Sequence, residues 1–243
     1  MQVQLFVTCL IDSLFPAVGE AVLTLLRSAG AEVGFPTGQT CCGQPAFNAG
    51  HWGEAAKMAR RTIEVFERCE GSVVVPSGSC AHMLRHGYLE LFRDEPLWLP
   101  RAERLAERTY ELSEFLVEQV GVQGFAVRYP HKLAYHPSCH LLRGLGIVEP
   151  PLQLLRSLEG SEVVPLAPEC CGFGGVFSVD HGEISAEMLH RKIKAIIDSE
   201  AEIVVAADVS CLMHMEGGLR KLGSKVRALH LAQALVGQEG GLR

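Results

Sequence analysis

The 243-residue sequence lacks a long uncharged apolar run, an excess of basic residues and a cationic leader. No apolar stretch approaches the roughly 18 residues that a membrane helix needs, so we expect no membrane span. The net charge of −6 argues against nucleic-acid binding, which requires a basic face. Residues 1–7 have no basic region and are typical of a strand, so we expect no signal peptide and a cytoplasmic location.

Cysteine, by contrast, is abundant, with nine residues in the chain. Disulfides are rare in a reducing compartment, so a repeated cysteine pattern there indicates metal or redox chemistry. Eight of the nine fall into two matching sets of four. The ninth, Cys69, lies outside the repeat, and we interpret it as a small buried hydrophobic residue.

Each set is centred on a vicinal pair followed by glycine, at Cys41-Cys42-Gly43 and again at Cys170-Cys171-Gly172. Corresponding cysteines of the two sets lie 129 to 131 positions apart. Solenoid repeats are only about 20–50 residues long, so this spacing predicts a duplicated domain. We expect two cysteine-rich domains, residues 1–125 and 126–243. The two quartets are Cys9, Cys41, Cys42 and Cys80, and Cys139, Cys170, Cys171 and Cys211.

Short apolar strands alternate with amphipathic helices in both halves, which predicts an α/β fold of two repeated halves with parallel sheets. The expected strands are 4–7, 32–35, 71–76, 132–135, 162–165, 202–206 and 225–228. The expected helices are 16–29, 52–69, 112–119, 151–158, 184–199 and 229–236, with further ones at Cys80 and Cys211. Residues 94–101 are expected to be irregular and 121–131 to form a linker.

Every quartet cysteine follows the carboxyl end of a predicted strand. Ligands gather at that edge of open α/β sheets, so we expect each quartet to converge there. Four thiolates in one place repel each other unless a cation holds them, and both iron–sulfur clusters and zinc satisfy four cysteines. The short Cys-x-x-Cys pairs usual for zinc are absent. The pattern therefore favours a cluster, most simply [4Fe–4S], one or two per chain, with zinc or merely buried cysteines as alternatives.

These motifs resemble the CCG cysteine-rich domain family, whose pattern is Cys, then Cys-Cys-Gly, then Cys-x-x-Cys. The chain is similar to the cysteine-rich component of heterodisulfide reductase and to the iron–sulfur subunit of glycolate oxidase. The two-domain chain as a whole looks most like the lactate utilisation A branch of the family. The Pro76-Ser-Gly-Ser-Cys80 and His136-Pro-Ser-Cys139-His140 contexts also resemble that branch. The resemblance covers nearly the whole chain.

The resemblance implies an iron–sulfur electron-transfer subunit of a cytosolic complex that oxidises L-lactate, or a related 2-hydroxy acid such as glycolate, to the 2-oxo acid. It also implies two partners, a ferredoxin-type iron–sulfur protein and a further subunit. No flavin or nicotinamide motif accompanies the cysteines, so we expect part of an oxidoreductase and assign no catalytic residue. The alternatives are a heterodisulfide-reductase-like thiol–disulfide enzyme and a zinc-binding structural subunit.

The chain departs from the fullest family pattern at one position in each half, where Ser77 and Asp208 replace the first cysteine of Cys-x-x-Cys. In heterodisulfide reductase five cysteines support noncubane clusters, so the lost thiol favours an ordinary four-ligand cluster. We interpret Ser77 and Asp208 first as helix N-caps, with ligation, above all by Asp208, as the alternative. His82, His140 and His214 lie near quartet cysteines and are candidates for hydrogen bonds to cluster sulfurs, or else surface and capping residues.

Overall fold

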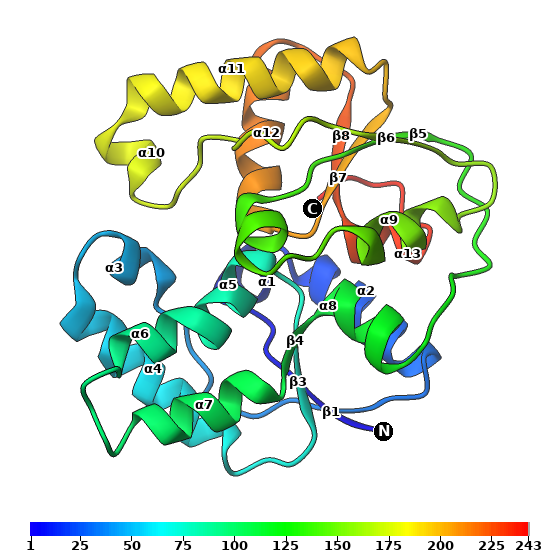
Figure 1. Cartoon of the computed structure of the whole chain (residues 1–243). Coiled ribbons are helices and arrows are strands. Elements are labelled where there is room, and N and C mark those ends of the chain that lie inside the picture. The colour runs from blue at the N-terminus through cyan, green and yellow to red at the C-terminus, as the bar shows by residue number, and fades with distance from the viewer. Residues whose placement is uncertain (243) are drawn as a thin grey trace.

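The structure, a computed structural model, describes residues 1–242 and places parallel sheets in both halves of the chain (Figure 1). The first sheet has the order β2-β1-β3-β4 and the second the order β6-β5-β7-β8, with every pairing parallel. The strands are β1 (Gln2–Leu5), β2 (Glu32–Gly34), β3 (Ser72–Val75), β4 (Thr109–Glu111), β5 (Lys132–Tyr135), β6 (Glu162–Pro165), β7 (Ile203–Ala206) and β8 (Arg227–His230). The same strand order in both halves confirms the predicted duplicated α/β fold.

Helices connect the strands and cover the sheets. In the first half they are α1 (Cys9–Leu14), α2 (Pro16–Ser28), α3 (Gln44–Asn48), α4 (Trp52–Phe66), α5 (Gly78–His82), the π-helical turn η1 (Met83–Gly87), α6 (Tyr88–Leu91), α7 (Leu99–Glu107), α8 (Leu112–Glu114) and η2 (Phe115–Gln119). In the second half they are η3 (His140–Gly144), α9 (Glu149–Arg156), α10 (Phe177–Asp180), α11 (Gly182–Asp198), α12 (Val209–Lys221) and α13 (Leu231–Leu235). Within residues 1–242, none combines the length and apolar character needed to cross a bilayer.

The region from Asp94 to Glu111 is more regular than the sequence suggested. Residues 94–101 were expected to be irregular because of Pro96 and Pro100, yet α7 begins at Leu99. Pro100 lies in the first turn of α7, where a backbone N–H has no partner within the helix, so the proline does not break it. The three-residue strand β4 was also missed, because so short a segment shows no periodicity.

The two halves share one apolar core. Helix α2 buries Val18, Val22 and Leu25 on one face, at the spacing of a helix that packs against other elements. This face belongs to the same buried cluster as Leu231 and Leu235 of α13, and α2 and α13 lie in contact. Residues from both halves are thus removed from water together. The domain boundary at residue 125 stays a prediction, since the core continues across it.

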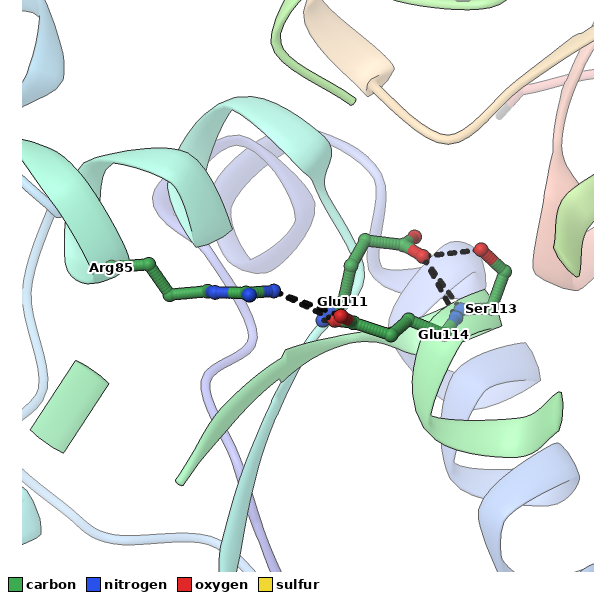
Figure 2. A network of polar contacts seen from close by, with 4 residues as sticks. All are labelled: Arg85, Glu111, Ser113 and Glu114. Carbon is green, nitrogen blue, oxygen red and sulfur yellow. Dashed lines mark hydrogen bonds and ion pairs between the residues drawn. The ribbon is translucent and has the colours of Figure 1, made fainter. Parts of the chain in front are cut away.

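Figure 2 shows a polar network that links the segment after Cys80 to the end of β4. Glu111 and Glu114 form a reciprocal capping box at the start of α8: the Glu111 carboxylate accepts the Ser113 N–H at 2.7 Å, and the Glu114 carboxylate accepts the Glu111 N–H at 3.1 Å. Arg85 of η1 pairs with Glu114 at 2.9 Å. The network therefore fixes the helical segment that carries Cys80 against the first sheet.

Glu111 is fully buried, and within residues 1–242 its Oε1 atom has no hydrogen-bond partner. Burial raises the pKa of this carboxyl to about 7, although hydrogen bonds from Ser113 and Glu114 oppose the rise. The folded protein therefore binds the Glu111 proton more tightly than the unfolded chain, whose carboxyl has a pKa near 4.5. This contribution to stability is present at acid pH and is lost as the pH rises through about 7.

We expect Glu111→Gln to abolish this part of the pH dependence. For the wild type, the Glu111 contribution to the free energy of unfolding should fall by on the order of 3 kcal/mol between pH 5 and pH 8. Urea unfolding at a series of pH values measures the slope. Glu118→Gln, at an exposed position of η2, is the matched control and should keep the wild-type slope. An unchanged slope in the Glu111 variant would contradict the assignment.

Candidate metal centre

The first quartet gathers at the carboxyl edge of the first sheet. Cys9 opens α1 directly after β1, Cys41 and Cys42 lie in the loop after β2, and Cys80 lies in the first turn of α5 after β3. The thiols interact in a continuous series, Cys9 with Cys41, Cys41 with Cys42, and Cys42 with Cys80. The last pair has its Sγ atoms 3.5 Å apart. Residues separated by 71 positions in the chain thus meet at one place.

The second quartet repeats this arrangement. Cys139 directly precedes η3, Cys170 and Cys171 lie in the loop after β6, and Cys211 lies in the first turn of α12 after β7. The thiols again interact in series, from Cys139 through Cys170 and Cys171 to Cys211. In the part of the chain that the structure describes, all the cysteines are free thiols.

The glycine after each vicinal pair has a specific backbone role. Gly43 and Gly172 have φ values of 88° and 91°, in the left-handed region that favours glycine. Their N–H groups donate to the sulfur two residues earlier, Gly43 to Cys41 at 3.5 Å and Gly172 to Cys170 at 3.4 Å. A Cβ atom added to Gly43 would lie 3.2 Å from a backbone carbonyl oxygen of α4. One added to Gly172 would lie 2.6 Å from a backbone carbonyl oxygen of α11. Each glycine therefore brings its cysteine loop close to a helix.

Both quartets line a single cavity of about 450 Å³ between the halves of the molecule. The cavity is largely walled by thiols and apolar groups, with a polar patch of Ser77, Ser79, Ser138, His140 and Asp208. Figure 1 shows α3 and α10, the short helices that follow the two vicinal pairs, on the same side of the molecule. The arrangement brings all eight quartet cysteines to one cavity, which is partly open to solvent.

Mutual contact sets the ionisation of the thiols. Contacts with Cys42 and Cys9 lower the pKa of Cys41 to about 3, whereas contact with Cys41 and burial raise the pKa of Cys9. Contacts with Cys41 and Cys80, together with burial, also raise the pKa of Cys42. One thiolate is thus stabilised by its protonated neighbours. Ionising the whole quartet requires a cation among the sulfurs, as metal binding provides.

The side chains of Ser77 and Asp208 hydrogen-bond to each other across the two halves. These are the two positions at which the chain lacks the family's fifth cysteine. The Ser77 hydroxyl accepts the Cys80 N–H at 3.3 Å, so the predicted N-cap is confirmed, and it donates to Asp208 Oδ1 at 2.7 Å. The Ser79 N–H donates to the same oxygen at 3.0 Å, and the Ser138 hydroxyl donates to Oδ2. Asp208 occupies the N-cap position of α12, but its carboxylate binds the start of α5 in the other half.

The histidines near the quartets mostly bind other groups. His140 lies at the cavity wall with its Nε2 atom 3.4 Å from the side-chain nitrogen of Gln44. The His82 ring centroid is 5.1 Å from that of His140, and His214 Nε2 lies 3.4 Å from the Ser185 hydroxyl. A role for these rings in binding cluster sulfurs stays a prediction.

His136 is a site residue that sequence reasoning missed. It is completely buried, and within residues 1–242 neither ring nitrogen has a hydrogen-bond partner. A ring nitrogen of His136 and the sulfurs of Cys171 and Cys211 all lie within 4.8 Å of one another. Burial and the nearby Lys192 lower the pKa of His136 to about 3, so the imidazole is neutral and able to donate a hydrogen bond or bind a metal. Its position three residues before Cys139 was the feature of the sequence that could have identified it as a site residue.

Comparisons with known proteins agree with this geometry. The family described as "CCG: Cysteine-rich domain" matches residues 3–85 and 133–216. A protein named lactate utilization protein A from Exiguobacterium sp. is 47% identical over 236 residues, covering 96% of each chain. Lactate utilization protein A 2 from Bacillus cereus is 44% identical over 237 residues, covering 97% of this chain and 98% of its own.

A solved structure shares the fold. The crystal structure of a hypothetical protein from Helicobacter pylori superposes with a TM-score of 0.65 at 11% sequence identity. The match covers 98% of this chain and 49% of the other. At this identity the likeness shows the fold alone.

We expect Asp208→Ala to weaken the junction between the halves. The carboxylate is buried, and although burial alone would raise its pKa, hydrogen bonds from Ser138, Ser77 and Ser79 leave that pKa below its ordinary value. Asp208 is therefore ionised at neutral pH, and its removal leaves the Ser79 N–H without its acceptor. The free energy of unfolding at pH 7 should fall by on the order of 3 kcal/mol.

Urea unfolding measures this change. Asp198→Ala is the matched control, because Asp198 is exposed and pairs only with Lys194 on the surface of α11. It should change the free energy of unfolding by no more than about 0.5 kcal/mol. Equal effects of the two substitutions would rule out a special role for Asp208.

Proposed function

The chain belongs to the CCG cysteine-rich domain family, and from this membership we propose that it is an iron–sulfur electron-transfer subunit of a lactate-utilisation system. The family match covers the cysteine-bearing part of both halves. The lactate utilization A proteins align with it over nearly their whole length. The single observation that carries the proposal is the convergence of eight thiols, as two quartets, on one cavity.

The position of the cysteines in the sequence supports a polynuclear cluster over a single zinc ion. The short Cys-x-x-Cys pairs usual for zinc are absent, and each quartet is instead drawn from three strand ends of an α/β half. The Gly43 and Gly172 N–H groups, which donate to Cys41 and Cys170, also suit the hydrogen bonding common around cluster sulfurs.

The first cluster would be held by Cys9, Cys41, Cys42 and Cys80, and the second by Cys139, Cys170, Cys171 and Cys211. When bound, a [4Fe–4S] cluster supplies one-electron exchange. The protein's own contribution is to supply the thiolates, to bury those of Cys42, Cys171 and Cys211, and to donate backbone N–H groups to the sulfurs of Cys41 and Cys170. Ligation by Asp208 stays a prediction; its two carboxylate oxygens already accept hydrogen bonds from Ser77, Ser79 and Ser138.

Oxidation of L-lactate to pyruvate releases two electrons and two protons. A hydride-accepting cofactor usually takes both electrons and one proton from the carbon as a hydride, and the hydroxyl proton goes to a base. We therefore place that step on another subunit and assign this chain the onward transfer of electrons. A ferredoxin-type iron–sulfur protein and a further subunit are the proposed partners, in the cytoplasm. The names of the relatives support lactate as the substrate of the system, with glycolate or another 2-hydroxy acid as the alternative.

A thiol–disulfide enzyme of the heterodisulfide-reductase kind is less well supported. The positions that would carry the fifth thiols hold Ser77 and Asp208, and these two side chains hydrogen-bond to each other. The proximity of Cys42 and Cys80, at 3.5 Å between sulfurs, permits disulfide formation in cluster-free protein but does not by itself provide a disulfide substrate site.

Metal analysis of anaerobically purified protein tests the assignment. We expect iron and acid-labile sulfide in equal amounts, and an electron paramagnetic resonance signal after reduction with dithionite. Cys42→Ala and Cys171→Ala should each remove the cluster of one quartet, so that either variant keeps about half of the iron. Cys69→Ala is the matched control, since Cys69 lies outside both quartets and donates to the Val65 carbonyl. It should keep all of the iron.

Stoichiometric zinc without sulfide would instead identify the structural alternative. Lactate-dependent reduction of the clusters in the presence of the partner subunits tests the role in the system. Turnover of a disulfide by the isolated chain with a reduced viologen would favour the thiol–disulfide enzyme.

A further inference from the structure

We propose that clusters bound by the two quartets have different reduction potentials. The second quartet would hold its cluster at the higher potential, because His136 and Lys192 lie close to it. This quartet consists of Cys139, Cys170, Cys171 and Cys211. This inference rests on the proposed function, since it presupposes a cluster in each quartet. It concerns a difference between two halves that share the same strand order and the same cysteine pattern.

The first difference is at the residue three positions before the leading cysteine. In the second half this is His136, and in the first half it is Phe6. Both side chains are completely buried. The Phe6 ring packs against Phe66, with centroids 5.7 Å apart, and offers no polar group. His136 has no partner within residues 1–242 and lies beside Cys171 and Cys211, so its N–H can be donated to a quartet sulfur.

The second difference is on the long helix behind each vicinal pair. Met58 of α4 packs against Gly43 as Met188 of α11 packs against Gly172, so these two positions correspond. Four residues further on, the first half has Thr62 and the second has Lys192.

Lys192 is a buried cation close to the second quartet. Its side chain is 1% exposed, and its ammonium donates to the Ala167 carbonyl at 2.8 Å. Burial lowers the pKa of Lys192, whereas Glu169 and the thiols of Cys171, Cys170 and Cys139 raise it. Lys192 also lies one turn of α11 after Met188, which packs against the glycine that follows Cys171, so the lysine is close to the second quartet. The first quartet has threonine at the corresponding position.

The other charged groups near the second quartet are Arg143, Glu169 and Asp208. Arg143 interacts with Cys139, but it is exposed, as is the oppositely charged Glu169, so solvent screens both. Asp208 is buried between the halves, accepts hydrogen bonds from groups beside both Cys80 and Cys139, and raises the pKa of Cys211. Lys192 and His136, in contrast, have no counterpart of the same kind in the first half.

In the first half, the arginine that follows Cys80 most closely is Arg85, and it is paired with Glu114. The largest influences on the pKa values of Cys9, Cys41 and Cys42 are other thiols, burial and backbone N–H groups. Other thiols, burial and backbone N–H groups are also the main influences on the pKa values of Cys170 and Cys171. The halves therefore differ in the groups around the quartets and not in the contacts among the thiols.

The physical consequence follows from the charge of the reduced state. Reduction adds one electron to a cluster without making or breaking a bond in the protein. The added negative charge is stabilised by hydrogen bonds to the sulfurs and by a nearby cation, and both raise the reduction potential. A buried cation acts more strongly than an exposed one, because its field is less screened. An electron that enters either half will therefore reside mainly on the second.

A redox titration of the anaerobically prepared full-length chain, followed by electron paramagnetic resonance, tests this order. We expect two one-electron waves. Cys80→Ala should remove the wave at lower potential, and Cys211→Ala should remove the one at higher potential. In each cysteine variant the remaining cluster keeps its wild-type surroundings. The assignment of each wave to a quartet therefore does not depend on whether a Lys192 variant folds.

Substitutions at the two proposed residues then test the cause. The Lys192→Met variant is poised at the midpoint potential of the wild-type second cluster. There, the ratio of oxidised to reduced second cluster should rise about tenfold, which corresponds to a shift of about 59 mV to lower potential. His136→Phe, which installs the residue of the first half, should shift the same wave in the same direction. His136→Gln keeps an N–H donor and should shift it less. Thr62→Val, the matched control in the first half, should leave the higher wave unchanged.

The inference is overturned if the higher wave belongs to the first quartet, if the waves coincide, if only one quartet holds a cluster, or if Lys192→Met leaves the higher wave in place. Each of these results leaves the proposed iron–sulfur function standing. Protein that binds no iron under anaerobic preparation would instead refute the proposed function itself.

Discussion

Thiols held in contact with one another cannot all ionise unless a cation lies among them, and this constraint governs the centre of the molecule. Each half brings four cysteines together, and in the first quartet the pKa of Cys41 is well below that of a free thiol, whereas the pKa values of Cys9 and Cys42 are raised. The protein thus builds sites whose full ligand form is electrostatically unfavourable until a positively charged group is bound. Such a site needs a scaffold that holds its ligands in place without help from the metal.

The scaffold is provided by two parallel sheets whose carboxyl edges face a common cavity. The inner strands β1, β3, β5 and β7 are largely buried, and the two halves share an apolar core through α2 and α13. Each glycine after a vicinal pair lets its loop approach a helix closely, and Arg85 and Glu114 hold the segment after Cys80 against the first sheet. An apolar core that spans both halves distinguishes this fold from small zinc modules, which unfold without metal.

Duplication has not left the halves identical. Ser77 and Asp208 occupy equivalent positions, yet the serine caps its own helix while the aspartate reaches across to the other half. His136 and Lys192 have the apolar Phe6 and the uncharged Thr62 as counterparts. Under the proposed electron-transfer role, unequal surroundings favour electron flow in one direction, because two equivalent sites would share an electron equally.

The sequence by itself determined the duplication, the alternation of strands and helices, and the placement of each quartet cysteine after a strand, because these follow from spacing and local periodicity. It also identified Ser77 as a cap. Only the tertiary structure decided that the two quartets share one cavity, that Asp208 joins the halves, and that His136 is buried without a partner beside two thiols. These features depend on contacts between residues some 70 or 130 positions apart, which no local pattern records. Strand β4 and helix α7 were missed because one is very short and the other begins beside a proline that its first turn tolerates.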